Sequence, residues 1–322
     1  MQPYFSMVFV LNSLTINYLQ MHNISTNFDK FYQIVKTSLS HKIDPSGNLQ
    51  FYPSKPKMND CTIIALSICA EAIGIDSENH LWGKIKKDYS SLFPNLIDRS
   101  NFNRRRRRLR FFTHEVSVKI SEMLSEGEDT FIVDSMPLPV CNIARQFSCK
   151  TGRETFETAP DKGFSAITQS YYHGYKMHLV TSVRGVFHSV DMTKASVHDI
   201  HFLEDIKYTK MGNATLIGDK GYISKEIKTD LFHTCNITLE TPKRKNQTDA
   251  EKWHPIFRKS RKRIETLFSQ LCDQMMFKRN YAKTFIGIAT RVFTKIAAVS
   301  CLQSMNYENN KPLNHLKYAL AV

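Results

Sequence analysis

The sequence contains no Cys-x-x-Cys pair, although it has seven cysteines among its 322 residues. Such pairs are typical of structural zinc sites and of redox-active dithiols. His198 and His201 could share one face of a helix, but no second pair of ligands accompanies them. We therefore expect no zinc site, and we expect the cysteines to be reduced thiols of a cytoplasmic protein.

Long apolar runs are also lacking. Residues 1–28 contain no Asp, Glu, Lys or Arg, but polar side chains interrupt the apolar stretch at 4–19. No basic segment precedes this stretch, and it is too polar to span a bilayer. No other segment looks long and apolar enough, so we expect no membrane partner.

Negative charge is scarce relative to positive charge. Lys and Arg number 44 against 30 Asp and Glu, which gives a formal net charge of +14. A field of this sign attracts polyanions, of which nucleic acid is the commonest. The hydrophobic content of 42% excludes a chain that is disordered throughout.

The densest positive charge is a run of arginines, Arg104, Arg105, Arg106, Arg107 and Arg108, followed by Arg110. Five consecutive arginines cover every face of a helix. We interpret the run as a DNA-binding element whose phosphate contacts raise affinity without reading bases. The alternative interpretation is a solvated helix face or a disordered arm.

The pattern changes twice along the chain. Residues 1–57 form an N-terminal extension and a connector rich in Pro, Ser and Gly. Residues 58–126 have helical spacing of apolar residues, with Asn59 or Asp60 capping the first helix and Ser100 or Asn101 capping a later one. Residues 127–305 alternate strand and helix patterns, including a hairpin turn at Arg184-Gly185, and 306–322 form a tail. This order predicts a small helical domain followed by a mixed α/β domain.

Three acids stand at distinctive places in the α/β region. Asp134 lies in the strand pattern "TFIVDSM", and Asp219 is the last residue of the strand pattern "TLIGD". Glu265 lies on the late helix "PIFRKSRKRIETLFSQL". Acids on separate elements can converge on Mg²⁺, which prefers oxygen ligands and leaves room for phosphate. Taken singly, each acid is equally typical of a turn or an exposed helix face. We also expect the prolines after Asp134 to end its strand.

Cations surround the third acid. Arg258, Arg261, Lys262 and Glu265 fall on one helical face. The simple interpretation is a salt-bridged, solvated face. The functional interpretation is that the cations hold DNA phosphates beside a metal site, with help from a basic segment after a strand, namely Lys243, Arg244 and Lys245.

Taken in order, the motifs "FPNLIDRSNFNRRRRRL", "IVDSMPLPVC", "HGYKMHLVTSVRGVF", "TKASVHD", "LIGDKGYIS" and "RKRIETLFSQL" resemble bacterial insertion-sequence transposases of the DDE type, most closely the 982 group. The resemblance spans about residues 58–300. It implies a ribonuclease-H-like sheet flanked by helices, with a helical DNA-binding domain before it. It also implies that Asp134, Asp219 and Glu265 are catalytic and hold two Mg²⁺ or Mn²⁺ ions.

The resemblance further implies an activity and its partners. Strands would be cut at the ends of the element, and the freed 3′-hydroxyls would then attack target DNA. Double-stranded DNA would be the partner of a homodimer or larger assembly, in the bacterial cytoplasm and associated with the nucleoid. A nuclease that cuts without joining and an inactive DNA-binding descendant are the alternatives.

Two features qualify the resemblance. His198 and Asp199 stand where related enzymes keep a similar pair, which implies a supporting role, although the pair could equally cap the next helix. Related transposases often carry Tyr, Arg, Glu and Lys on the last helix. Here Arg258 replaces the Tyr and Cys272 replaces the Lys, so we transfer neither role.

Overall fold

A computed structural model of the protein describes residues 23–209, 211–243 and 255–320. The chain divides into two compact units. Unit 1 contains the residues up to Ile120, Gln274–Met276 and the residues from Thr290 onwards. Unit 2 contains Ser121–Asp273 and Phe277–Ala289. The first boundary lies close to the one predicted from sequence. The segment from Thr290, however, groups with the N-terminal helices instead of with the α/β region.

Unit 1 is helical. Asn59 caps α3, since its side chain accepts a hydrogen bond from the Thr62 amide at 2.8 Å. The cap of α5 is Asp98, which accepts from the Asn101 amide at 2.9 Å, and not Ser100 or Asn101 as predicted. The helices that lie wholly or partly in unit 1 are α2 (Ile24–Ser38), α3 (Asp60–Ala72), α4 (Glu78–Asp88), α5 (Arg99–Arg108), α6 (Arg110–Leu124), α10 (Phe285–Glu308) and α11 (Leu316–Leu320).

A buried network of charges holds unit 1 together. Glu71 on α3 is 3% exposed, and its carboxylate contacts Lys295 Nζ at 2.5 Å, Arg106 Nη2 at 3.1 Å and Arg291 Nη2 at 3.5 Å. Arg106 also reaches Glu78 at 3.3 Å. Burial alone would raise the pKa of Glu71, but the three cations hold that pKa below its usual value. The network therefore ties α3, α5 and α10 together.

Helix α10 corrects one expectation from the sequence. It is long and apolar enough to cross a membrane, but 72% of its apolar window is buried inside the protein. Lys295, in the middle of this helix, is 1% exposed and pairs with Glu71. A buried and internally paired lysine is what a core helix of a folded unit accommodates. We therefore interpret α10 as a core helix.

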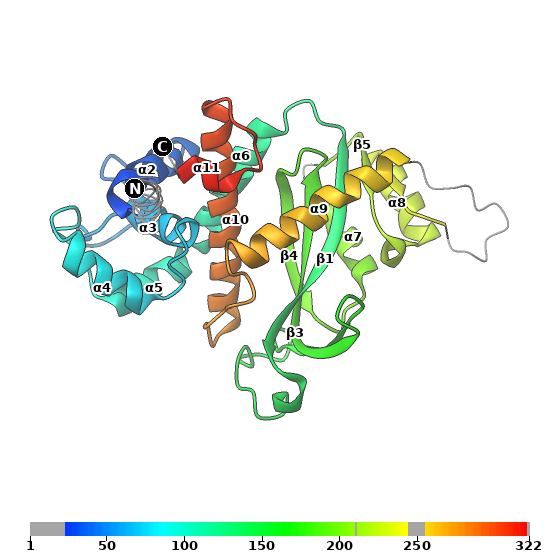
Figure 1. The fold of residues 1–322 in the computed structure, drawn as a ribbon, viewed down its shortest axis with the longest axis horizontal. Helices are drawn as coiled ribbons and strands as arrows, with labels where there is room; N and C mark the ends of the chain where they lie inside the picture. Colours follow the sequence, from blue (N-terminus) through cyan, green and yellow to red (C-terminus); the bar gives the residue numbers. More distant parts are fainter. Residues whose placement is uncertain (1–22, 210, 244–254, 321–322) are drawn as a thin grey trace, which may run out of the picture. The chain divides into compact units, whose positions relative to one another are not determined.

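Unit 2 is built on a mixed six-stranded sheet (Figure 1). Its first three long strands are antiparallel, with β3 between β1 and β4, and the short β2 also pairs with β3. On the other side of β1, β5 and then β6 run parallel to it. The mixed α/β prediction is confirmed, although β2 was not predicted. The strands are β1 (Thr130–Cys141), β2 (Asp161–Ser165), β3 (Ser170–Ser182), β4 (Phe187–Lys194), β5 (Ala214–Ile217) and β6 (Ile237–Glu240).

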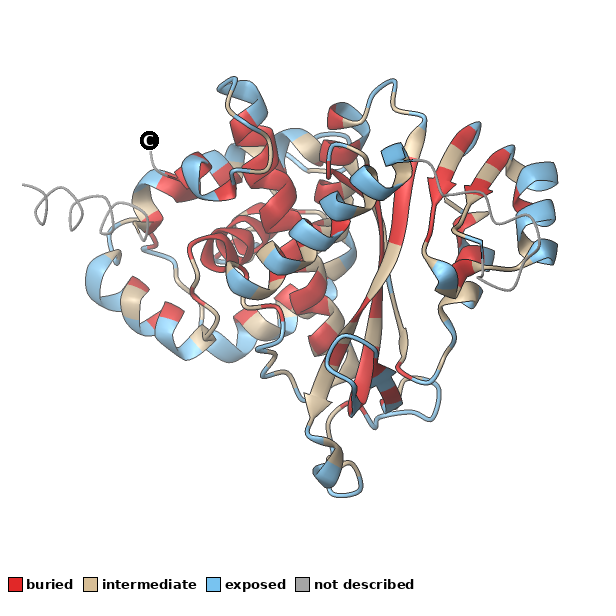
Figure 2. Ribbon diagram, turned by 45° about the vertical axis from the view of Figure 1, so that its right-hand side comes forward, coloured by how far each residue is buried: buried red, intermediate tan, exposed pale blue. Residues whose placement is uncertain are grey.

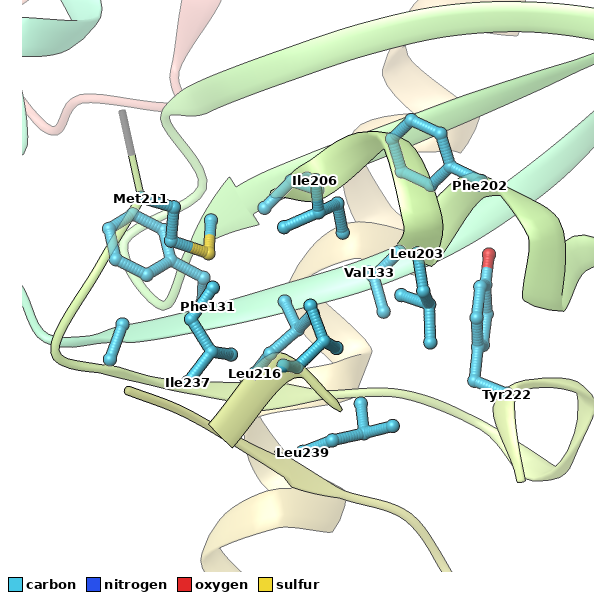
Figure 3. Close-up of a cluster of buried hydrophobic side chains, with 13 residues drawn as sticks. Phe131, Val133, Phe202, Leu203, Ile206, Met211, Leu216, Tyr222, Ile237 and Leu239 are labelled. Carbon is cyan, nitrogen blue, oxygen red and sulfur yellow. The ribbon is translucent and has the colours of Figure 1, made fainter. Parts of the chain in front are cut away.

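Side chains alternate between the two faces of β1, as the pleat of a strand requires. Phe131 and Val133 join a buried apolar cluster with residues of the neighbouring strands and of α7 (Phe202–Ile206) and α8 (Lys225–Cys235) (Figure 3). Asp134 belongs to the opposite face, which is covered by α9 (Pro255–Asp273).

The helix α9 lies across the sheet in Figure 1. It carries an apolar stripe on one side. Ile264, Leu267 and Leu271 are buried there. Figure 2 shows buried and exposed residues following one another along this helix. An amphipathic helix of this kind packs its apolar stripe on the sheet and leaves its charged face in solvent.

The prolines after Asp134 do not end the strand, so that prediction was wrong. β1 continues to Cys141, with Pro137 opposite Lys176 and Pro139 opposite Gly174 on β3. The two prolines are two residues apart, so their backbone nitrogens point to the same edge of β1. On the side of β5 this edge is paired only up to Ile132. Their missing N–H groups thus face the unpaired edge, where the ladder needs no hydrogen bond from them.

The buried network yields a prediction about stability. Replacing Glu71 with Gln leaves Lys295, Arg106 and Arg291 buried without their shared carboxylate. We expect the free energy of unfolding in urea to fall by about 3–5 kcal/mol. Asp88→Asn is the control, because it removes a surface ion pair with Lys84 at 3.7 Å and should cost less than about 1 kcal/mol. Equal decreases in the two variants would contradict a structural role for the network.

Candidate active site

Asp134 lies on β1, and Asp219 lies just beyond the end of β5, the parallel neighbour of β1. Ile132 on β1 pairs with Ile217 on β5, and each acid follows two residues later. Because side chains alternate with a period of two, Asp134 belongs to the face opposite the apolar cluster. Asp219 lies two residues beyond the end of β5, where it caps the short helix that follows. The register of the sheet therefore brings together two residues that lie 85 positions apart in sequence.

The turn after β5 brings Asp219 close to another acid, Asp199. Asp219 Oδ1 accepts a hydrogen bond from the Gly221 amide at 2.7 Å, at the start of the short helix η3 (Lys220–Tyr222). A Cβ at Gly221 would lie 2.9 Å from Asp219 Oδ1 and 3.4 Å from Asp199 Oδ2. Glycine thus leaves room for both carboxylates. Lys176 on β3 donates to Asp199 Oδ1 at 2.7 Å and fixes its side chain.

Glu265 reaches the site from α9 through an arginine. Arg261 Nη2 lies 3.7 Å from Asp134 Oδ2 and 3.7 Å from Glu265 Oε1. The guanidinium group therefore stands between the two carboxylates. The Glu265 side chain is 58% exposed, whereas that of Asp134 is 16% exposed. The site is thus buried at the sheet and open at the helix.

The electrostatics of the site show a shortage of positive charge. Burial raises the pKa of Asp134 to about 7, and the negative charges of Asp219 and Asp199 act in the same direction. The Ser135 amide and Arg261 lower this pKa, but they do not offset the burial. Burial, followed by the same three carboxylates, also raises the pKa of Tyr222 well above its usual range. An added cation would relieve this electrostatic cost.

The donor set fits a hard cation. Carboxylate oxygens are the ligands that Mg²⁺ and Mn²⁺ take, and a buried acid with a raised pKa gains from a nearby cation. In the described part of the chain, however, no three Asp, Glu, His or Cys side chains are already gathered closely enough to hold a metal ion. Arg261 lies between two of the candidate ligands, so a metal bound there would require this side chain to shift.

The predicted DNA-binding residues separate into groups. Arg106 is buried against Glu71 and Glu78, and Arg105 binds Asp60 at 2.5 Å. The exposed or half-exposed members of the run are Arg104, Arg107, Arg108 and Arg110. On α9, Arg258 and Lys262 are exposed, whereas Arg261 points to Asp134. In the segment after β6, Lys243 is exposed. Arg244 and Lys245 lie outside the described residues.

The comparison with known families agrees with this geometry. A family model described as a transposase DDE domain matches residues 125–301, which is more than half of the chain. The chain belongs to this family of DDE transposase domains. No curated protein and no solved structure matches it. The matched region begins just before β1 and includes all three of the predicted acids.

Some residues of this DDE transposase domain were not singled out from the sequence. Lys176 and Tyr222 lie beside the acids, although both belong to motifs that carried the resemblance. Tyr222 could have been noticed because it follows Asp219 closely in sequence. Lys176 could not, because only the register of β3 against β1 places it. His198 caps the short helix η2 (Asp199–His201), where its Nδ1 accepts from the Ile200 amide at 3.3 Å.

The raised pKa of Asp134 predicts how the stability of the protein depends on pH. Between the ordinary value of 3.8 and about 7, the folded protein holds a proton that the unfolded chain releases. Without divalent metal, the stability contributed by this proton is therefore lost as pH rises through that window. We expect Asp134→Asn to have a higher melting temperature than wild type at pH 8 and a similar one at pH 4. Identical pH profiles would contradict the burial of this carboxylate.

Proposed function

We propose that the protein is an insertion-sequence DNA transposase, most similar to the 982 group, that cuts DNA at the ends of its element and joins them to target DNA. The proposal rests on the register that brings Asp219 close to Asp134 and on Arg261, which stands between Asp134 and Glu265, in a DDE transposase domain. The ribonuclease-H-like fold implied by the resemblance is supported by three antiparallel strands followed by two parallel ones, with helices beside them.

We assign the three acids as the ligands of Mg²⁺ or Mn²⁺, in a site for two ions. The bound metal would supply charge stabilisation for phosphodiester cleavage and transfer. Asp134 and Asp219 are fixed by the sheet, and Glu265 approaches from the exposed face of α9, so phosphate can enter from the solvent side. Lys176 holds Asp199 beside the site, and we assign this pair a positioning role.

We assign DNA contacts to the solvent-facing basic residues. In α5 and the start of α6 these are Arg104, Arg107, Arg108 and Arg110, and we leave out Arg105 and Arg106 because carboxylates already engage them. In unit 2 they are Lys243, Arg258 and Lys262. We propose the same role for Arg244 and Lys245, which lie outside the described residues. Pairing two DNA ends requires at least a homodimer. We place this assembly on the nucleoid in the bacterial cytoplasm.

The acids yield the first test of function. Labelled duplex DNA that spans the flanks of the gene is incubated with the protein and Mg²⁺ or Mn²⁺. We expect site-specific nicks and joined products from wild type. With Asp134→Asn or Asp219→Asn we expect neither, while DNA affinity stays within about twofold, because the phosphate contacts lie elsewhere. Nicks without joining would indicate a nuclease, and binding without nicks by wild type would indicate an inactive descendant.

The basic residues yield a second test. Each phosphate that a cation neutralises contributes about 0.9 to the slope of log affinity against log salt. Replacing both Arg104 and Arg108 with Gln should therefore reduce that slope by about 1.8. The matched control replaces Lys30 and Lys36 of α2, which are also exposed cations of unit 1, and should leave the slope unchanged. Equal slopes in the two double variants would mean that the arginine run is a solvated helix face and does not contact DNA.

A further inference from the structure

Unit 2 contains a cationic pocket that the proposed function does not use. The pocket has a volume of about 530 Å³ and includes Arg145, Lys150 and Lys283 in its wall. No acid lines it, and within the described residues none of these three cations lies within ion-pair distance of a carboxylate. The rest of its wall is formed by Val140, Cys141, Ser148, Cys149 and Thr151. Three unpaired cations facing one cavity create a focused positive field.

Backbone contacts hold this pocket in shape. The Gly152 amide donates to the Lys283 carbonyl at 2.9 Å, and the Phe285 amide donates to the Glu154 carboxylate at 3.1 Å. Gly152 has φ +74°, and an added Cβ there would collide with the Tyr175 hydroxyl. The loop after β1 is thus fastened at two points to the segment that leads into α10. A pocket fixed in this way loses little conformational entropy when an anion binds.

The pocket lies at a defined distance from the acids. Cys141, at the end of β1, lines the pocket and lies seven positions after Asp134 on the same strand. At about 3.3 Å per residue, this corresponds to at most roughly 23 Å along the strand, because the register of β1 shifts between Pro139 and Cys141. The rise of B-DNA is about 3.4 Å per base pair. A straight duplex whose axis runs along β1 would cover this distance in about seven base pairs.

We propose that a DNA duplex lies along β1 and that the pocket binds a backbone phosphate of this duplex, about seven base pairs from the phosphate that is cut. This inference rests on the proposed function, since it takes the acids as the cutting site. A phosphodiester supplies the anion that the cations lack, and the rigid strand fixes its distance from Asp134. Such a contact would set where along the DNA the cut is made, through position and not through base recognition.

The test compares two double variants that each remove two positive charges. Arg145→Gln with Lys283→Gln empties the pocket of two cations. Lys225→Gln with Lys228→Gln removes two from α8, which packs against the opposite face of the sheet from Asp134. At about 0.9 units of salt slope per contact, two contacts contribute roughly 30-fold to affinity in 0.15 M salt. We expect that decrease only in the pocket variant, measured on a duplex extending 15 base pairs to each side of the cut.

Shortening the DNA then locates the contact. The duplex is trimmed from each side of the cut in turn. Wild type should bind DNA more tightly than the pocket variant until fewer than about six base pairs remain on one side of the cut, and from there on the two affinities should be equal. A difference that persists at every length would overturn the proposal. Competition by inorganic phosphate at low millimolar concentration, without any effect of DNA length, would also overturn it and show a site for a free anion.

The same experiment separates this inference from the proposed function. Asp134→Asn should show the full dependence on DNA length, because it leaves the pocket intact. Cleavage that survives in Asp134→Asn would defeat the assignment of the acids without affecting the measured phosphate contact. A pocket variant that binds every duplex as wild type does, while Asp134→Asn fails to cut, would defeat the pocket and leave the acids in place.

Discussion

The burial of a carboxylate in the middle of a sheet is the constraint around which unit 2 is arranged. Asp134 lies on β1, which pairs with the antiparallel β3 on one side and, up to Ile132, with the parallel β5 on the other. Removing a carboxylate from water is costly unless a cation compensates for it. The neighbouring acids increase that cost, because Asp219 and Asp199 raise the pKa of Asp134 beyond the effect of burial. A site of this kind is expensive for stability and is retained where chemistry requires it.

The topology of the sheet explains why the three acids are so far apart in sequence. Between Asp134 and Asp219 the chain completes β2, the β3–β4 hairpin and α7 before it returns as β5 on the free side of β1. Between Asp219 and Glu265 it forms α8 and β6 and then crosses the sheet as α9. The strand and helix patterns could therefore be predicted locally, while the proximity of Asp219 to Asp134 depended on strand order and register. The parallel pairing of Ile132 with Ile217 supplies that missing information.

Other features were beyond the reach of sequence patterns for similar reasons. The arginine run was expected to face DNA, but the partners of Arg106 include Glu71, which lies 35 residues earlier on another helix. No local pattern reveals such a partner. The prolines of β1 were expected to break the strand, because a sequence does not show that one edge of the strand is unpaired at that point. The helix caps were closer to the prediction, since capping depends on residues within one turn.

The two clusters of buried charge in this protein show how environment decides between structure and chemistry. Glu71 is buried, yet three cations at 2.5–3.5 Å lower its pKa. It therefore stays ionised and links three helices. Asp134 has one cation, Arg261, at 3.7 Å, which is too far for a hydrogen bond. Its pKa therefore rises to about 7. The first cluster is complete within the chain, whereas the second is short of positive charge, which a bound metal ion would supply. This difference, more than the presence of acids alone, makes Asp134 the centre of the candidate active site.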